Sequence, residues 1–429
     1  MRGKRLEVRG ERLEVSGYWL GVTGEWGAEG AGGYGVTGWK QVMVIKVFFR
    51  MKKCFFLHIA LMIIVLAACR HDDEIFIPEH VEVSKPEYTS ISGFYLLNEG
   101  NMGSNKCTLD YYDYTTGVYS RNIYGSANPS VPKELGDVGN DLAIYGSRLY
   151  AVVNCSNKVE VMDAATCVRI GQIEIPNCRY IKFHEGYAYV TSYAGPVVID
   201  PEYEQLGYVA KVDTLTLREE ARCTVGFQPD GLEIVDGKIY VANSGGYRVP
   251  NYERRVSVID LATFKVQEEI DIDINLQYVC CDSHGGLWIS SRGDYVESTS
   301  RLYCYDVRKR RIVAEVDVPV SDMTLVGDSL YIVSNAWSNV TQSATPSYSI
   351  VDVVRKEVVC DNFITDGTDA VIRKPYGIAV NPLTHDIYVT DGRNYVNPGY
   401  LYCFDSNGVQ KWNVRTGDIP AHIAFYEKR

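Results

Sequence analysis

The sequence predicts an all-β protein, a seven-bladed β-propeller whose ring is closed by pairing of the N- and C-terminal strands. Three observations lead to this fold. A strand with an aromatic residue near its start recurs seven times, and each copy stands among further strands and tight turns. The chain also ends in a further strand, which comes after the four strands of the last repeat are complete. Four strands per repeat of this length are typical of a propeller blade.

The recurring strand is rich in β-branched and aromatic residues, and its polarity alternates. Neighbouring copies are 39 to 57 residues apart, the extremes being Tyr150 to Tyr189 and Tyr331 to Tyr388. Because apolar residues follow period 2 and turn signals are dense, helical repeats are excluded. The seven copies span residues 94–98, 149–154, 188–192, 239–244, 287–291, 330–334 and 387–391.

Further strands flank the recurring strand. Most copies precede a strand that ends in an apolar residue and Asp, as in 159–163 and 302–306. The first copy has no strand before it, and residues 422–426 fit as its missing innermost strand. Joining both ends of the chain in one sheet leaves no open edge. From the second copy onward a strand and a tight turn come first, at 141–146, 180–186, 231–237, 278–282, 322–327 and 377–382.

Residues 51–69 contain the three parts of an export signal in the expected order. Lys52 and Lys53 precede an apolar run that ends in small residues and Cys69. The run is short for a bilayer span and is followed at once by charged residues. Its ending, Leu-Ala-Ala-Cys, resembles the lipobox of bacterial lipoproteins, in which the cysteine is acylated. A plain membrane anchor that ends in cysteine is the alternative interpretation.

This signal sets the expected domain boundaries. A signal peptide works only at an N-terminus, and residues 1–50 are low-complexity sequence with no core-building pattern. We therefore expect translation to start at Met51 and residues 1–50 to be a mis-assigned upstream extension. The signal peptide is expected at 51–68, a lipidated linker at 69–91 and the propeller at 92–429.

The mature chain is acidic. Residues 1–68 hold 10 of the 43 Lys and Arg and 5 of the 54 Asp and Glu, which leaves 33 basic and 49 acidic residues and a net charge of −16. Clustered cations are needed for phosphate contacts, so this balance argues against nucleic-acid binding. The acidic run 72–74 resembles the export tag of Bacteroidetes surface lipoproteins, although a solvated linker explains it equally well.

Aromatic residues follow the recurring strand where polar turn residues would be the default. Exposed rings around a concave mouth indicate a binding surface, and tyrosine suits a ligand that is both apolar and hydrogen-bonding. The alternative is that the rings pack between blades, which we expect for about half of them. The aromatic residues are Tyr193, Tyr247, Tyr295, Trp337 and Tyr395, with Met102 at the matching place in the first repeat and Arg248, Arg292 and Arg393 beside them.

The first positions of the innermost strands add polar candidates. They are Asp141, Arg179, Asp230, Gln277, Asp322, Tyr376 and His422. Their mixed chemistry does not build one repeated metal site, and turn or channel-mouth chemistry explains them equally well. We include Arg179 and Asp230 among the candidate ligand-binding residues. No catalytic residue, metal site or cofactor is predicted, since no nucleophile elbow or phosphate-cradling glycine loop stands at the right place.

Ten cysteines follow the predicted anchor. The exported compartment permits disulfides, yet a domain of this size buries enough core without them. Several lie within strand-like runs, such as Cys304 and Cys403, where cysteine serves as a small apolar residue. We interpret most of them as free core thiols.

Four runs, at 94–103, 240–248, 362–369 and 418–422, resemble the surface lipoprotein propellers of gut Bacteroidetes. Within this YncE-like superfamily, residues 92–426 are most similar to the BtuG-type cobalamin-binding lipoproteins. The resemblance implies a non-enzymatic protein, anchored at the outer-membrane surface through Cys69, that captures cobalamin or a related corrinoid. It also implies transfer of the ligand to a TonB-dependent outer-membrane transporter.

A corrinoid is compatible with the residues, because its flat faces suit aromatic contacts, its amides suit Asn and Asp, and its phosphate suits arginine. Two alternatives stay open. The propeller could bind another nutrient, such as a glycan, siderophore or haem, or it could be a lactonase- or lyase-type enzyme.

Overall fold

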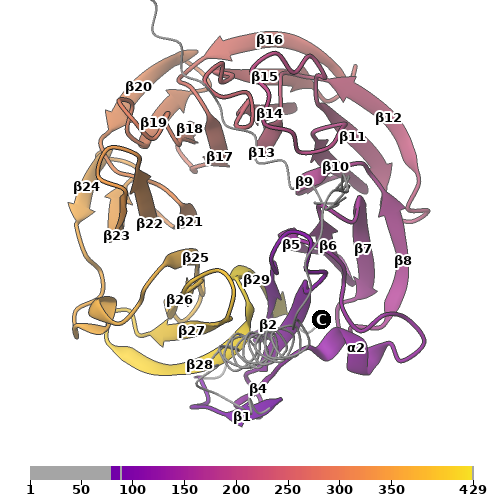
Figure 1. The fold of residues 1–429 in the computed structure, drawn as a ribbon, viewed down its shortest axis with the longest axis vertical. Helices are drawn as coiled ribbons and strands as arrows, with labels where there is room; N and C mark the ends of the chain where they lie inside the picture. Colours follow the sequence, from indigo (N-terminus) through magenta and orange to yellow (C-terminus); the bar gives the residue numbers. More distant parts are fainter. Residues whose placement is uncertain (1–78, 87–88, 428–429) are drawn as a thin grey trace, which may run out of the picture. The chain divides into compact units, whose positions relative to one another are not determined.

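The structure, a computed structural model, describes residues 79–86 and 89–427. Seven sheets stand in a ring, so that each sheet is one blade of a β-propeller (Figure 1). The predicted all-β, seven-bladed fold is confirmed. The predicted upstream extension, the signal peptide, the lipidated Cys69 and linker residues 70–78 lie outside the described residues.

Blade 1 joins the two ends of the described chain. Its innermost strand is the last one, β29, which pairs antiparallel with β2 through partners such as Phe94 and Phe425. The predicted closure of the ring is therefore confirmed. A three-residue strand within the predicted linker, β1, was not anticipated and extends the outer edge of the blade. From the channel outward the strands are β29 (Pro420–Glu427), β2 (Ile91–Asn98), β3 (Thr108–Asp113), β4 (Val118–Ser120) and β1 (His80–Glu82).

The other blades are each built from four consecutive strands, which run in order from the channel outward. Blade 2 contains β5 (Gly139–Tyr145), β6 (Arg148–Val153), β7 (Lys158–Asp163) and β8 (Arg169–Glu174). Blade 3 contains β9 (Cys178–His184), β10 (Tyr187–Ser192), β11 (Tyr208–Asp213) and β12 (Glu219–Thr224). Blade 4 contains β13 (Pro229–Val235), β14 (Lys238–Asn243), β15 (Arg255–Asp260) and β16 (Lys265–Asp271).

The remaining three blades follow the same order. Blade 5 contains β17 (Leu276–Cys281), β18 (Gly286–Ser291), β19 (Arg301–Asp306) and β20 (Arg311–Val316). Blade 6 contains β21 (Asp322–Val326), β22 (Ser329–Ser338), β23 (Ser343–Asp352) and β24 (Glu357–Cys360). Blade 7 contains β25 (Pro375–Val380), β26 (Ile387–Asp391), β27 (Pro398–Phe404) and β28 (Gln410–Asp418). Two short helices, α2 (Ile123–Ala127) and η1 (Thr368–Ala370), lie in connections between blades. None of the helices in the described ranges is long and apolar enough to cross a membrane.

Burial follows the place of each strand in its blade. The second strands are enclosed between neighbouring blades, and every residue of β18 is buried. An outermost strand faces solvent on one side, so β16 alternates between exposed and partly buried residues. The core lies between blades, as where Tyr150 of blade 2 packs in one cluster with Ile181 and Val190 of blade 3.

The turns explain two motifs of the sequence. Asp236 and Gly237 both have positive φ, 49° and 73°, as the two-residue turn between β13 and β14 requires. The Asp that ends a third strand accepts backbone N–H groups of the following turn. Asp306 accepts them from Arg308 and Lys309, and its hydrogen bonds with Lys309 lower the pKa of the Asp306 carboxyl to about 2.

The cysteines of the described residues are all free. Cys178, Cys304 and Cys403 are buried within strands, as expected for small apolar core residues. Burial raises the pKa of the Cys178 thiol to about 12. Such thiols stay protonated at neutral pH, which is consistent with a packing role.

Candidate functional site

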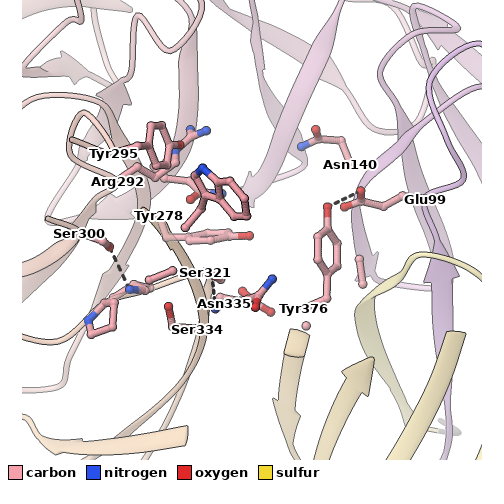
Figure 2. A pocket seen from close by; sticks show the side chains of 18 of the residues that line it. Glu99, Asn140, Tyr278, Arg292, Tyr295, Ser300, Ser321, Ser334, Asn335 and Tyr376 are labelled. Atoms are coloured by element: carbon pink, nitrogen blue, oxygen red, sulfur yellow. Dashed lines mark hydrogen bonds between the residues drawn. The ribbon is translucent and has the colours of Figure 1, made fainter. Parts of the chain in front are cut away.

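A cavity of about 750 Å³ opens at the centre of the ring, at the end where the innermost strands begin (Figure 2). This volume lies within the usual range for small-molecule sites. All seven blades contribute to it. The lining includes Glu99, Asn140, Arg179, Tyr247, Tyr278, Trp337 and Tyr376, from blades 1 to 7 in that order.

Antiparallel pairing brings the lining residues together. The first strand of a blade begins beside the end of the second, as Leu276 pairs with Ser291 in blade 5 and Pro375 with Asp391 in blade 7. The loop after the second strand therefore lies next to the residues that open the first strand. This geometry explains why both predicted sets of candidates contribute to one cavity.

Ten of the predicted mouth and first-strand residues line the cavity. Trp337 is 45% exposed on the long hairpin of β22 and β23, and its Nε1 donates to Asn339 Oδ1 at 2.8 Å. The backbone N of Asn339 donates to the carbonyl of Tyr295 at 2.8 Å, which ties this hairpin to blade 5. The ten residues are Met102, Arg179, Tyr247, Gln277, Arg292, Tyr295, Asp322, Trp337, Tyr376 and His422.

Tyr193 does not lie on the exposed rim that its place after a second strand predicts. Its side chain is buried, and its hydroxyl donates to Asp230 Oδ1 at 2.6 Å. The ring also packs against Tyr247, with 6.3 Å between ring centroids. Tyr193 therefore supports the wall of the cavity from behind, which is the packing role expected for about half of the rings.

Three further candidates also lie outside the lining. The guanidinium of Arg248 sits 3.8 Å from the centroid of the Phe227 ring, and that of Arg393 lies 5.5 Å from the Tyr400 ring. Tyr395 packs edge-on against Tyr376, with 5.7 Å between centroids. These side chains stabilise the loops around the mouth through cation–π and ring–ring contacts within the protein.

Asp230 lies beneath the lining and is fully buried. Its carboxylate accepts hydrogen bonds from Arg179 Nε at 3.0 Å, from the Tyr193 hydroxyl and from Arg292. Burial by itself would raise the pKa of this carboxyl, but the two guanidiniums and the hydroxyl hold it below its ordinary value. Asp230 is thus an ionised anchor for two lining arginines rather than a group that reaches the cavity.

The opposite side of the cavity carries carboxyl groups. Glu99 Oε2 accepts a hydrogen bond from the Tyr376 hydroxyl at 2.7 Å, and Glu99 Oε1 lies 3.3 Å from His422 Nε2. Asp322 accepts the backbone N–H of Ile378 at 2.8 Å. Burial raises the pKa of the Asp322 carboxyl to about 7. For His422, burial lowers the pKa, but Glu99 outweighs this effect and the net shift is upward.

Several lining residues were not singled out from the sequence. Tyr180 and Tyr278 contact each other edge-on, with 5.7 Å between ring centroids, and Glu99 and Asn335 reach the cavity from blades 1 and 6. Tyr180 and Tyr278 each stand one position after a residue that was predicted to open an innermost strand. Because a β-bulge interrupts β17 between Leu276 and Val279, the two consecutive residues within it, Gln277 and Tyr278, both line the cavity.

Groups of three or more His, Cys, Asp or Glu side chains placed to hold a metal ion are absent from residues 79–86 and 89–427. The arrangement is an aromatic and amide-lined cavity with a cationic side and a carboxylate side. Such a cavity can bind an amphipathic molecule that carries polar groups at its edge.

A sequence model of a family described as a domain of unknown function, DUF5074, matches residues 92–428. No curated protein matches the chain. Among solved structures, a quinonprotein alcohol dehydrogenase-like protein from Bacteroides thetaiotaomicron is similar, with 14% identity, a TM-score of 0.54 and 79% of each chain covered. Kuenenia stuttgartiensis hydrazine synthase has 16% identity and a TM-score of 0.50, over 63% of this chain and 77% of the other. At these identities the likeness shows the fold alone.

Proposed function

The chain belongs to the DUF5074 family, and we propose that its propeller captures cobalamin or a related corrinoid. The observation that carries this proposal is the cavity itself, which is walled by tyrosine and tryptophan rings from several blades. Tyr247, Tyr278, Tyr295 and Trp337 offer flat apolar area together with the tyrosine hydroxyl groups. This combination suits a flat macrocycle with a polar edge.

The amide side chains support the same ligand. Asn140, Gln277 and Asn335 line the cavity between the aromatic residues. An amide both donates and accepts, so these residues are matched to the peripheral amides of a corrinoid. A preformed cavity of this kind binds without ordering loops first, which reduces the entropic cost of association.

The proposed function places the protein on the outer membrane at the cell surface. The lipobox ending at Cys69 supplies the anchor, and the acidic residues after it fit surface export. From there the protein would pass the ligand to a TonB-dependent transporter. An enzymatic role is not part of this proposal.

The test is titration of the mature chain with cyanocobalamin by isothermal calorimetry, supported by gel filtration to detect co-migrating red colour. Tyr247→Ala and Trp337→Ala should each weaken binding by roughly thirtyfold, because truncating an aromatic anchor commonly costs about 2 kcal/mol. Their melting temperatures should stay close to that of the wild type. Leu215→Ala is the control, since Leu215 is 79% exposed in a turn at the other end of its blade. Absence of cyanocobalamin binding by the wild type would overturn the proposal.

A further inference from the structure

One wall of the cavity is built around two arginines that share a single aspartate. Arg179 comes from β9 of blade 3, Arg292 follows β18 of blade 5, and Asp230 opens β13 of the blade between them. Both guanidiniums bond to the Asp230 carboxylate. The Arg179 guanidinium also lies 4.7 Å from the centroid of the Tyr193 ring behind it.

This wall keeps an excess of positive charge. Two guanidiniums and one carboxylate leave a net charge of +1, and the pKa of Asp230 lies below its ordinary value, so the carboxylate stays ionised. Burial opposes the charge of Arg179, yet Tyr193 and Asp230 outweigh it and raise the arginine pKa further. The positive charge therefore persists at any physiological pH.

The same wall has unused hydrogen-bond donors. Within residues 79–86 and 89–427, Arg179 bonds to Asp230 through Nε alone, so its two Nη groups have no protein partner. Arg292 Nε is buried, and no protein acceptor within the described chain reaches it. A planar guanidinium presents its donors in a fixed fork that matches the oxygens of a carboxylate or phosphate. Asp230 thus holds both guanidiniums in place, and the Nη groups of Arg179 are able to donate to a ligand.

The opposite wall carries two carboxyl groups and His422, which lies beside Glu99. In Figure 2, Arg292 lies on one side of the cavity, and Glu99, Asn140 and Tyr376 lie on the other. The Glu99 carboxylate is there, already accepting a hydrogen bond from Tyr376. Asp322 adds a second carboxyl group to the lining. The cavity is therefore polarised across its width.

We infer that the ligand of this cavity carries an anionic group, a phosphate or a carboxylate, which binds between Arg179 and Arg292 and turns the uncharged hydrogen-bonding groups of the ligand toward Glu99. The inference rests on the proposed binding function of the cavity and adds the charge and the orientation of the ligand. It does not depend on the ligand being a corrinoid, because the arginine wall would select the same anionic group on any molecule of suitable size.

The test uses small aromatic probes of nearly one shape. Benzoate, phenyl phosphate and the neutral isostere benzamide are titrated into the mature chain and followed by ligand-observed NMR. Both anions should bind at least about tenfold more tightly than benzamide, since hydrogen bonds to charged groups are worth roughly 1.5–3 kcal/mol. The difference between benzoate and phenyl phosphate tells which of the two anionic groups the wall prefers.

Arg292→Gln should remove the preference for the anions, while Arg292→Lys, which keeps the charge but loses the fork, should retain part of it. Arg222→Gln is the matched control, because Arg222 lies on the outermost strand β12 and pairs with Glu219 on the blade surface. Circular dichroism melts show whether each variant is folded. Equal affinity for the anions and benzamide, no measurable binding of either anion, or an unchanged preference in folded Arg292→Gln would each overturn the inference.

These results separate the inference from the proposed function. If cyanocobalamin fails to bind but benzoate or phenyl phosphate binds through Arg292, the corrinoid assignment fails and the anionic subsite stands. If cyanocobalamin binds equally well to the wild type and to Arg292→Gln, the corrinoid assignment stands and the anionic subsite fails.

Discussion

Removal of residues 419–429 should prevent stable folding of the propeller, although the segment lies at the end of the chain. These residues form β29, the innermost strand of blade 1, which pairs with β2 near the other end of the described chain. Without β29, the backbone N–H and C=O groups of β2 that now pair with it would face water along the channel. The ring would then have an open edge, which is a site for aggregation.

The expected loss in the free energy of unfolding can be worked out from the side chains that β29 covers. Phe94 and Leu96 of β2 are fully buried, and Phe425 of β29 packs against Phe94 and Tyr388, with 6.0 Å between centroids in each case. Fully burying one large apolar side chain stabilises a fold by about 1.5–3 kcal/mol. Partial exposure of Phe94 and Leu96, together with loss of the burial of Ile423 and Phe425, therefore costs about 5 kcal/mol. Since a domain has only about 5–15 kcal/mol of net stability, this loss removes between about a third of it and all of it.

The assay is urea unfolding followed by circular dichroism, together with gel filtration to detect aggregation. The control is a chain that ends at Glu427, which keeps all of β29. The control should unfold at the wild-type urea midpoint, and the truncated chain should show either no cooperative transition or a much lower midpoint. A truncated chain with an unchanged midpoint would refute the closure argument.

Three further outcomes are expected. Cys69→Ser should leave the propeller folded and release it from membranes, so a variant that still sediments with outer membranes after a salt wash contradicts the lipid anchor. Because the folded pKa of the Asp322 carboxyl is raised to about 7 and that of His422 is also raised, protonation favours the folded state, and the melting temperature should rise as pH falls from about 8 to 5. Asp322→Asn should flatten this profile, and an equally steep one would refute the assignment. Tyr193→Phe should cost about 1–3 kcal/mol of stability in urea melts, because it removes a hydroxyl donor from buried Asp230. Unchanged stability would contradict that role.

The fold could be predicted because its signal is repeated. Each second strand is enclosed between blades, so its apolar and aromatic residues make it easy to recognise. The seven copies of this strand and the six tight turns before them all indicate the same repeat. The sequence of strand β1 shows no repeated apolar or aromatic pattern of this kind. Its three residues, His80–Glu82, are mostly exposed and have no apolar pattern, and only pairing with β4 makes them a strand. Tertiary context decides such short segments.

The position of the cavity could be predicted from the sequence, but not which of the candidate side chains line it. Tyr193 and Tyr247 both follow a second strand, and both were predicted to lie at the mouth of the cavity. The difference comes from blade 4, where Asp230 provides a buried acceptor for the Tyr193 hydroxyl. Tyr247 has no such acceptor beneath it in the described part of the chain and lines the cavity instead. Contacts between residues of different blades decide which ring is buried, and these contacts are not visible in single repeats.

The same dependence on distant residues links ring closure to the site. The closing strand β29 brings Ala421 and His422 to the cavity, where His422 lies beside Glu99 from the other end of the folded domain. The carboxylate wall is therefore complete only when both ends of the chain meet in blade 1. The arginine wall likewise requires three consecutive blades, because Asp230 must hold Arg179 and Arg292 at once. Hence the polarised cavity is a property of the closed ring, because its two walls come from blades that only ring closure brings to face each other.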